Sequence, residues 1–236
     1  MKISIDPKKV LTTLVAVTLA LATTHIVTSY LRSYTNVHEY ATGALVLFDM
    51  DAEVSIPTWY AQLLLAAASF LLLTIGVAKR RSTQKYYKHW IALGFMFVYI
   101  SMDEGSQIHE LLVSPLRDFF NTSGTLLNFA WVIGGALVTS VIAVIYFRFW
   151  LNLPSKTRLL FLASAAIFIG GALGIEMIGG YYLSNHGYNF GYQMITLIEE
   201  TMEKMGIALF IYTLLDYMKY AKIDIDLRIK PSNLIE

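Results

Sequence analysis

Several acidic residues of this 236-residue chain stand inside long apolar stretches, where charged side chains are rare. One group occurs between Ser101 and Glu110, a second is the single glutamate Glu176 among glycines, and a third begins at Glu199. Ionisable side chains inside a membrane are costly, so they usually face the bundle interior and mark a site or a pathway. The candidate metal-ligating residues are Asp103, Glu104, His109, Glu110, Glu176, Glu199, Glu200 and Glu203.

Carboxylates with a single imidazole are typical ligands of hard or borderline metal ions. The seven carboxylates of this set face at most Lys204 and His109 as positive partners. Like charges cannot all ionise unpaired at low dielectric constant, so either some carboxyl groups are protonated or cations are bound. We therefore expect a divalent metal ion as cofactor, with iron, manganese, magnesium, calcium and zinc as the alternatives.

A di-iron site is a weaker expectation than a cation site in general. The Glu-x-x-His signature of di-metal bundles is absent, because His109 follows Glu104 by five positions. A further alternative is that the acids form hydrogen bonds with polar neighbours or face a hydrated outer vestibule. Among the candidate ligands, His109 and Glu110 lie at the end of segment 101–110 and are the first candidates for such an interfacial role.

Helical periodicity would bring these residues onto common faces. With 100° between successive residues, Asp103 and Glu110 share one stripe of a single helix. The glutamates at 199–203 fall within one arc, and Tyr192 and Thr196 extend the same face. We expect all three segments to hold their acids in the outer half of the membrane, at comparable depth.

The composition defines the class of protein that must position these residues. Hydrophobic residues make up 56% and charged residues 15% of the chain, against about 25% charged in soluble domains. The absence of cysteine excludes disulfide scaffolds, zinc ribbons and thiol nucleophiles. The net charge of +1 offers no general attraction to nucleic acid. These properties predict a single, all-α transmembrane domain over residues 1–236.

Six stretches are long and apolar enough to cross the hydrocarbon core, which takes about 20 residues. The spans are predicted at residues 10–30, 56–77, 90–112, 126–149, 159–183 and 194–215, with one long acidic outer loop at 33–55. Most lysines and arginines fall on one side of this arrangement, which places both termini in the cytoplasm. Alternatively, the first span is a cleaved signal peptide, which would leave five spans in the same orientation.

Two polar features lie outside the main set. The acids Asp49, Asp51 and Glu53 of the outer loop are expected to form a solvated segment, or else a lid that collects cations at a vestibule. His25 lies in the outer half of the first span, where a single histidine usually bridges two helices. It is also the best candidate for a second imidazole ligand.

Two runs carry a resemblance to a known group of proteins. Residues 48–60 and the Asp103-Glu104 to His109-Glu110 segment resemble uncharacterised bacterial multi-pass membrane proteins. The resemblance covers the second and third predicted spans. It implies a location in a bacterial membrane, which we expect to be the inner membrane, and implies no activity.

Three functions compete on these grounds. The first is a membrane metalloprotein, with an enzyme acting on a lipidic or small apolar substrate as one form of it. The second is a cation or proton-coupled transporter or channel, which requires a polar route to the cytoplasm that the apolar stretches 64–74, 136–145 and 207–215 do not offer. The third is an accessory subunit of a membrane complex. The expected partners are the lipid bilayer and either another membrane protein or a second copy of the chain.

Overall fold

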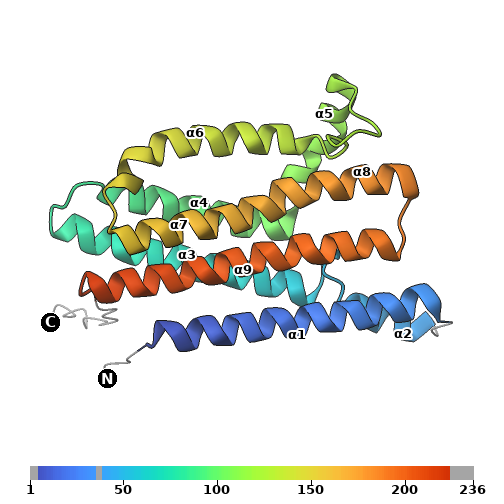
Figure 1. Cartoon of the computed structure of the whole chain (residues 1–236), viewed down its shortest axis with the longest axis horizontal. Coiled ribbons are helices and arrows are strands. Elements are labelled where there is room, and N and C mark those ends of the chain that lie inside the picture. The colour runs from blue at the N-terminus through green and yellow to red at the C-terminus, as the bar shows by residue number, and fades with distance from the viewer. Residues whose placement is uncertain (1–4, 36–38, 224–236) are drawn as a thin grey trace, which may run out of the picture.

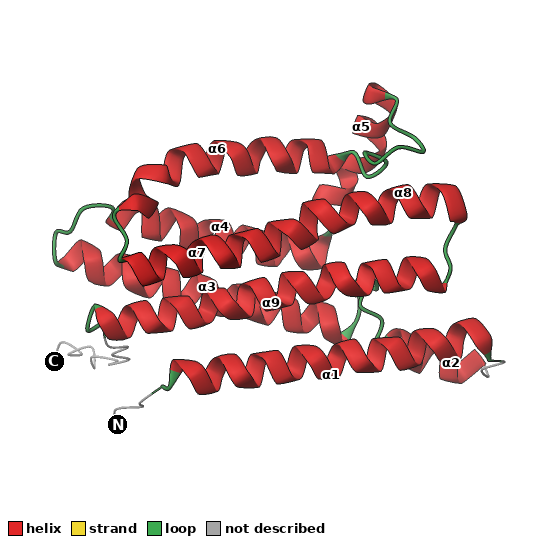
Figure 2. Ribbon diagram, in the orientation of Figure 1, coloured by secondary structure: helices red, strands yellow, loops and turns green. Residues whose placement is uncertain are grey.

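The computed structural model describes residues 5–35 and 39–223, and these residues form helices without any strand (Figure 2). This confirms the all-α prediction for the described part of the chain. In chain order the elements are α1 (Pro7–Tyr34), α2 (Glu39–Val46), α3 (Ile56–Arg81), α4 (Tyr87–Ser106), the 3₁₀-helix η1 (His109–Leu112), α5 (Val113–Phe120), α6 (Trp131–Leu151), α7 (Ser155–Ile169), the π-helix η2 (Gly170–Ile175), α8 (Glu176–His186) and α9 (Phe190–Tyr220).

Local capping explains where the long helices begin. Asp6 accepts a hydrogen bond from the backbone N–H of Lys8 at the start of α1, and Asn189 caps α9 in the same way. Ser55 caps α3 and is followed by a proline in the first turn. Short polar caps satisfy the free N–H groups of a first turn, and proline fits there because it lacks an N–H.

The long helices lie side by side as an elongated bundle (Figure 1). The start of α1, the end of α9 and the α3–α4 and α6–α7 turns lie at one end, whereas α2, α5 and the α8–α9 connection lie at the other. Four helices are long and apolar enough to cross a membrane, namely α1, α3, α6 and the continuous α7–η2–α8 rod from Ser155 to His186. This is the composition of a membrane protein.

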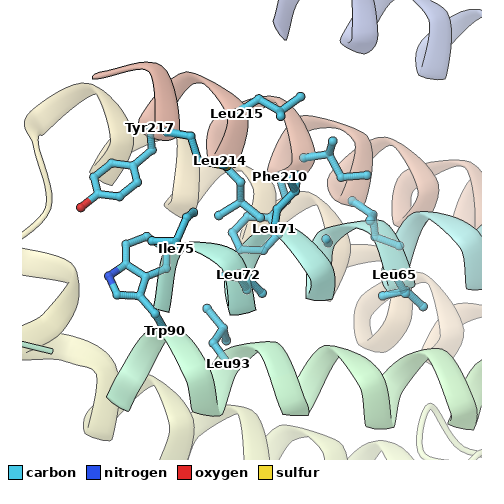
Figure 3. Close-up of a cluster of buried hydrophobic side chains, with 14 of the residues drawn as sticks. Leu65, Leu71, Leu72, Ile75, Trp90, Leu93, Phe210, Leu214, Leu215 and Tyr217 are labelled. Carbon is cyan, nitrogen blue, oxygen red and sulfur yellow. The ribbon is translucent and has the colours of Figure 1, made fainter. Parts of the chain in front are cut away.

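The apolar core joins α3, α4 and α9 (Figure 3). Leu72, Ile75 and Leu214 are completely buried in it, and the ring of Trp90 stacks on Tyr217 with 5.0 Å between centroids. These residues lie on the parts of the three helices nearest the chain termini. The candidate site lies on the C-terminal half of α4 and the N-terminal half of α9, and the core holds the opposite halves of these two helices together.

The structure corrects the predicted third span. The helix α4 ends at Ser106 rather than near residue 112, because Gln107 adopts a left-handed conformation with φ 48° and ψ 43°. Glu110 therefore lies on the separate helix η1, and the prediction that Asp103 and Glu110 share one helical stripe is wrong.

Two connections also differ from the prediction. The outer loop at 33–55 contains the helix α2, and its residues 36–38 lie outside the described residues. A second long connection, from 107 to 130, contains η1 and α5, so α6 begins at Trp131 instead of near residue 126. Loop 33–55 is thus not the only long connection at this end of the bundle.

Candidate functional site

A cavity of about 1140 Å³ runs between α4, α6, α7 and α9, and its outer end is lined by η1, η2, α8 and the loop at 50–53. All eight residues predicted as metal ligands line this one cavity. They are Asp103, Glu104, His109, Glu110, Glu176, Glu199, Glu200 and Glu203. The structure thus brings the acids of three separate segments to one place, although the helical stripe expected for one segment does not exist.

Glu176 is at the junction of three helices. The π-helix η2 widens the rod directly before it, and such bulges are frequent at functional sites. Its carboxyl group lies within hydrogen-bonding reach of Glu199 on α9. On the other side, the indole N–H of Trp131 donates to Glu176 Oε1 at 3.3 Å. Glu176 therefore connects α8 with both α6 and α9.

Glycines let the backbone of the α7–η2–α8 rod pack closely against the backbone of α9. A Cβ atom at Gly171 would lie 2.9 Å from the carbonyl oxygen of Glu199, and one at Gly206 would lie 2.7 Å from the backbone nitrogen of Phe168. Real Cβ atoms do not approach other atoms so closely, so only glycine fits. Small residues that let membrane helices approach in this way are common at their interfaces.

Asp103 holds the side chain of His109 in place through two hydrogen bonds. Its Oδ1 accepts the backbone N–H of His109 at 2.9 Å, and its Oδ2 accepts the ring Nδ1–H at 2.7 Å. The imidazole also lies against Trp131, with 4.5 Å between ring centroids. A carboxylate that holds one ring nitrogen leaves the other available to a metal ion or a substrate.

Lys204 partly compensates the acids. Its side chain is 0% exposed, and its ammonium group pairs with Glu200 one helical turn earlier. Lys204 does not line the cavity, whereas Glu200 does. The ammonium group of Lys204 thus compensates the negative charge of Glu200 without lining the cavity itself. The other cavity carboxyl groups have no lysine partner of this kind in the described structure.

The loop at 49–53 closes the outer end of the bundle. The backbone N–H of Met50 donates to His25 Nδ1 at 2.9 Å, so the proton of the neutral ring is on Nε2, which faces the carbonyl of Gln193 at 3.3 Å. Asp49 pairs with Arg32. His25 is 0% exposed and does not line the cavity, which supports its interpretation as a bridge between helix and loop.

Two acids of this loop, Asp51 and Glu53, line the mouth of the cavity. Asp51 is solvent-exposed by surface area, but the protein that surrounds its carboxyl group displaces much of the bulk water. That desolvation, together with repulsion from Asp49 and Glu200, raises the pKa of Asp51 to about 7. The cavity mouth therefore gains negative charge near neutral pH.

The side chains do not form a ready-made metal centre. Within residues 5–35 and 39–223, no three histidine, aspartate or glutamate side chains converge closely enough to hold an ion. The hydroxyl of Thr196, a residue only 4% exposed, lines the cavity; the Tyr192 hydroxyl is close to it, but no hydrogen bond of normal geometry forms to it within the described residues. Buried polar groups without partners are uncommon and call for an explanation such as a bound ligand.

Sequence reasoning missed Trp131 as a site residue. A tryptophan near the start of a span is expected at the membrane interface for its ring alone. Nothing in its sequence position indicates that its N–H is directed at Glu176. Asp51 and Glu53 were predicted as a loop or lid, and their position at the cavity mouth is consistent with the lid.

The described residues form a helical protein with four helices long and apolar enough to cross a membrane and a partly open cavity lined by acids. The family described as "Domain of unknown function (DUF8692)" matches residues 11–217, so the chain belongs to that family. This membership agrees with the expected resemblance to uncharacterised proteins. No curated protein and no solved structure matches the chain.

Proposed function

We propose that this chain is an integral membrane protein with six spans, and that its cavity carboxylates bind a divalent metal ion in the outer half of the membrane. Both termini would lie in the cytoplasm, with a bacterial inner membrane as the expected location. The chain would act as a metalloenzyme on a lipidic or small apolar molecule. The observation that carries the proposal is that all eight predicted residues line the same cavity.

The donor set suits a hard or borderline ion. Glu176, Glu199 and Glu203 would supply carboxylate oxygens from two helices, and His109 would supply its Nε2 atom. Because these side chains do not converge in their present positions, binding would require rotation of the long glutamate side chains. A bound ion would serve as a Lewis acid toward an oxygen-bearing group.

The arrangement gives little support to the transport alternative. Inward from Glu203 the cavity wall is mostly apolar, with side chains such as Leu93, Phe97 and Phe210, and its few polar residues are Thr139, Tyr146 and Ser164. A transported ion would need polar groups along that route. An accessory-subunit role does not explain why acids line a cavity. The experiment below tests this role through co-purified subunits.

Elemental analysis of the detergent-purified full chain tests the proposal. We expect a stoichiometric divalent metal in the wild-type protein and its loss in the Glu176→Gln, Glu203→Gln double variant. Asp118→Asn is the matched control, because Asp118 is an exposed acid on α5 that does not line the cavity. Wild-type protein without metal would overturn the proposal. Cation flux in liposomes would then indicate transport, and co-purified subunits would indicate an accessory role.

A further inference from the structure

The cavity continues far beyond the acids as an apolar arm. We define this arm by the cavity-lining residues of the inner half: Leu93, Met96, Phe97, Ile100, Val138, Ile142, Ala143, Tyr146, Phe149, Trp150, Phe161, Leu162, Ala165, Phe168, Ile169, Ile207 and Phe210. Along α6 the arm extends from Val138 to Trp150, a distance of about 18 Å at roughly 1.5 Å per residue. It therefore covers a little more than half of the hydrocarbon core, which is about 30 Å thick.

The polar atoms at the inner end of the arm are already satisfied. The hydroxyl of Tyr146 donates to the carbonyl of His89 at 3.1 Å, and the indole N–H of Trp150 donates to the carbonyl of Arg158 at 2.9 Å. Ser164 donates to Leu160 within its own helix. These side chains thus offer the arm mainly their apolar surface, which suits a hydrocarbon chain and not a polar solute.

Helix α6 gives the arm a side that faces the membrane. Polar bonds hold α6 near its ends, at Trp131 to Glu176 and at Tyr146 to His89. Between these points α6 follows a separate course beside α7 and α4 (Figure 1). Large side chains of its middle turns, including Leu137, Val141 and Val144, are exposed. A chain from the bilayer could reach the arm laterally without crossing water.

The size of the cavity fits a long chain. Its volume of about 1140 Å³ exceeds the roughly 300–1,000 Å³ of ordinary small-molecule sites. A small apolar substrate would leave most of the arm unfilled. A single long alkyl or isoprenoid chain would instead contact the whole wall from the acids to the aromatic end. Because such a chain would come from lipid and not from water, van der Waals packing against the wall would supply the gain in free energy.

Charge restricts the head group. Within the described chain, the cavity wall contains nine carboxyl side chains, one imidazole and no lysine or arginine. The carboxyl groups belong to Asp51, Glu53, Asp103, Glu104, Glu110, Glu176, Glu199, Glu200 and Glu203. A phosphate or carboxylate head would find no cationic side chain to pair with, and the two positive charges of a divalent ion would be outnumbered by the nine surrounding carboxyl groups. A cationic head would compete with the metal ion of the proposed function for the same oxygens.

We infer that the cavity binds a lipid with one long hydrocarbon chain and an uncharged, oxygen-bearing head, the chain in the arm and the head among the acids. This inference about the head rests on the proposed metal site, whereas the inference about the chain rests on the arm alone. Trp131 and the hydroxyl of Thr196 lie at the head end. The substrate class is therefore a long-chain alcohol, aldehyde or ketone.

Photo-crosslinking of the full chain in phosphatidylcholine vesicles tests the inference. Three probes share one alkyl chain with a diazirine near its free end, and their heads are an alcohol, a phosphate and a trimethylammonium. Ala165 and its neighbour Ala166 are both exposed on α7, but only Ala165 lines the arm. Ala165→Trp places an indole in the arm and obstructs it, and Ala166→Trp is the matched control for a tryptophan on the same helix.

We expect the alcohol probe to label peptides of the arm in the wild type and in Ala166→Trp. Labelling in Ala165→Trp should fall about tenfold or more, because an indole in the arm would clash with a chain that extends past this position. Equal labelling of the two variants would overturn the chain site. Stronger labelling by the phosphate or ammonium probe would overturn the uncharged head.

Metal content and thermal unfolding are measured on the same samples. Ala165→Trp with normal metal content and reduced labelling supports the inference. If Ala165→Trp does not fold, unlabelled 1-octadecanol is added to the wild type, where loss of labelling supports the chain site and undiminished labelling overturns it. Wild-type protein that binds the chain but contains no metal would overturn the proposed function and leave the chain site supported.

Discussion

Asp103 holds His109 through two hydrogen bonds, one to the backbone N–H and one to the ring, with donor–acceptor distances of 2.9 and 2.7 Å. The left-handed conformation of Gln107 makes this possible, because it ends α4 and turns the chain back over the helix end. Asp103 therefore caps the turn and also orients the imidazole. Its role is that of a positioning residue behind His109.

The first prediction concerns this pair. Asp103→Asn keeps the size of the side chain but removes its charge and one of its two acceptor oxygens. We expect the affinity for Mn²⁺ to fall by roughly 10–100-fold, as is usual when the group that orients a histidine ligand is lost. Equilibrium dialysis measures this affinity, with Asp118→Asn as the charge-matched control. Affinity equal to that of the wild type would contradict the assignment.

The second prediction concerns pH. Because desolvation raises the pKa of Asp51 to about 7, its ionisation is less favourable in the folded than in the unfolded chain. Its stabilising contribution is complete below the unfolded pKa, near 4, and is lost as the pH rises through about 7. We expect the Tm of metal-free protein to fall from about pH 5 to pH 8, and Asp51→Asn to reduce that fall. Thermal unfolding in detergent measures both, and an unchanged slope in the variant would be the contrary result.

The third prediction concerns the buried Lys204. In Lys204→Met, Glu200 loses the ammonium group with which it pairs. Removing one partner of a buried ion pair costs roughly 3–5 kcal/mol, so we expect a loss of that order in the free energy of unfolding. The double variant Lys204→Met, Glu200→Gln should recover much of it, because no uncompensated charge remains. Denaturation in mixed micelles compares the three proteins, and a stable single variant would refute the prediction.

The fourth prediction concerns the loop at the cavity mouth. In His25→Phe the backbone N–H of Met50 loses its acceptor, which costs about 1–3 kcal/mol for a buried group. We expect amide exchange around Met50 to accelerate roughly 10–100-fold, the equivalent of that free energy. Hydrogen exchange with mass spectrometry detects this, with the exposed His186→Phe as control. Unchanged protection would show that His25 does not secure the loop.

The sequence alone predicted the all-α class of fold and a set of eight residues that line one cavity. Hydropathy and composition are local properties, so long apolar helices follow from them directly, as in α3 and α7. The penalty for a charge in hydrocarbon is equally local, which is why Glu176 and Glu199 could be selected before their surroundings were known. All eight selected residues line one cavity.

Only the tertiary structure decided how these residues are connected. The break at Gln107 depends on a backbone conformation that helical periodicity cannot anticipate, and it separates Glu110 from the face of Asp103. The contact of Trp131 with Glu176 joins helices that are 45 positions apart in the chain. The apolar arm likewise depends on how far α6 lies from α7, which is set by packing between helices. Apolar residues that line a chamber and apolar residues that face lipid look the same in a sequence, because both avoid water.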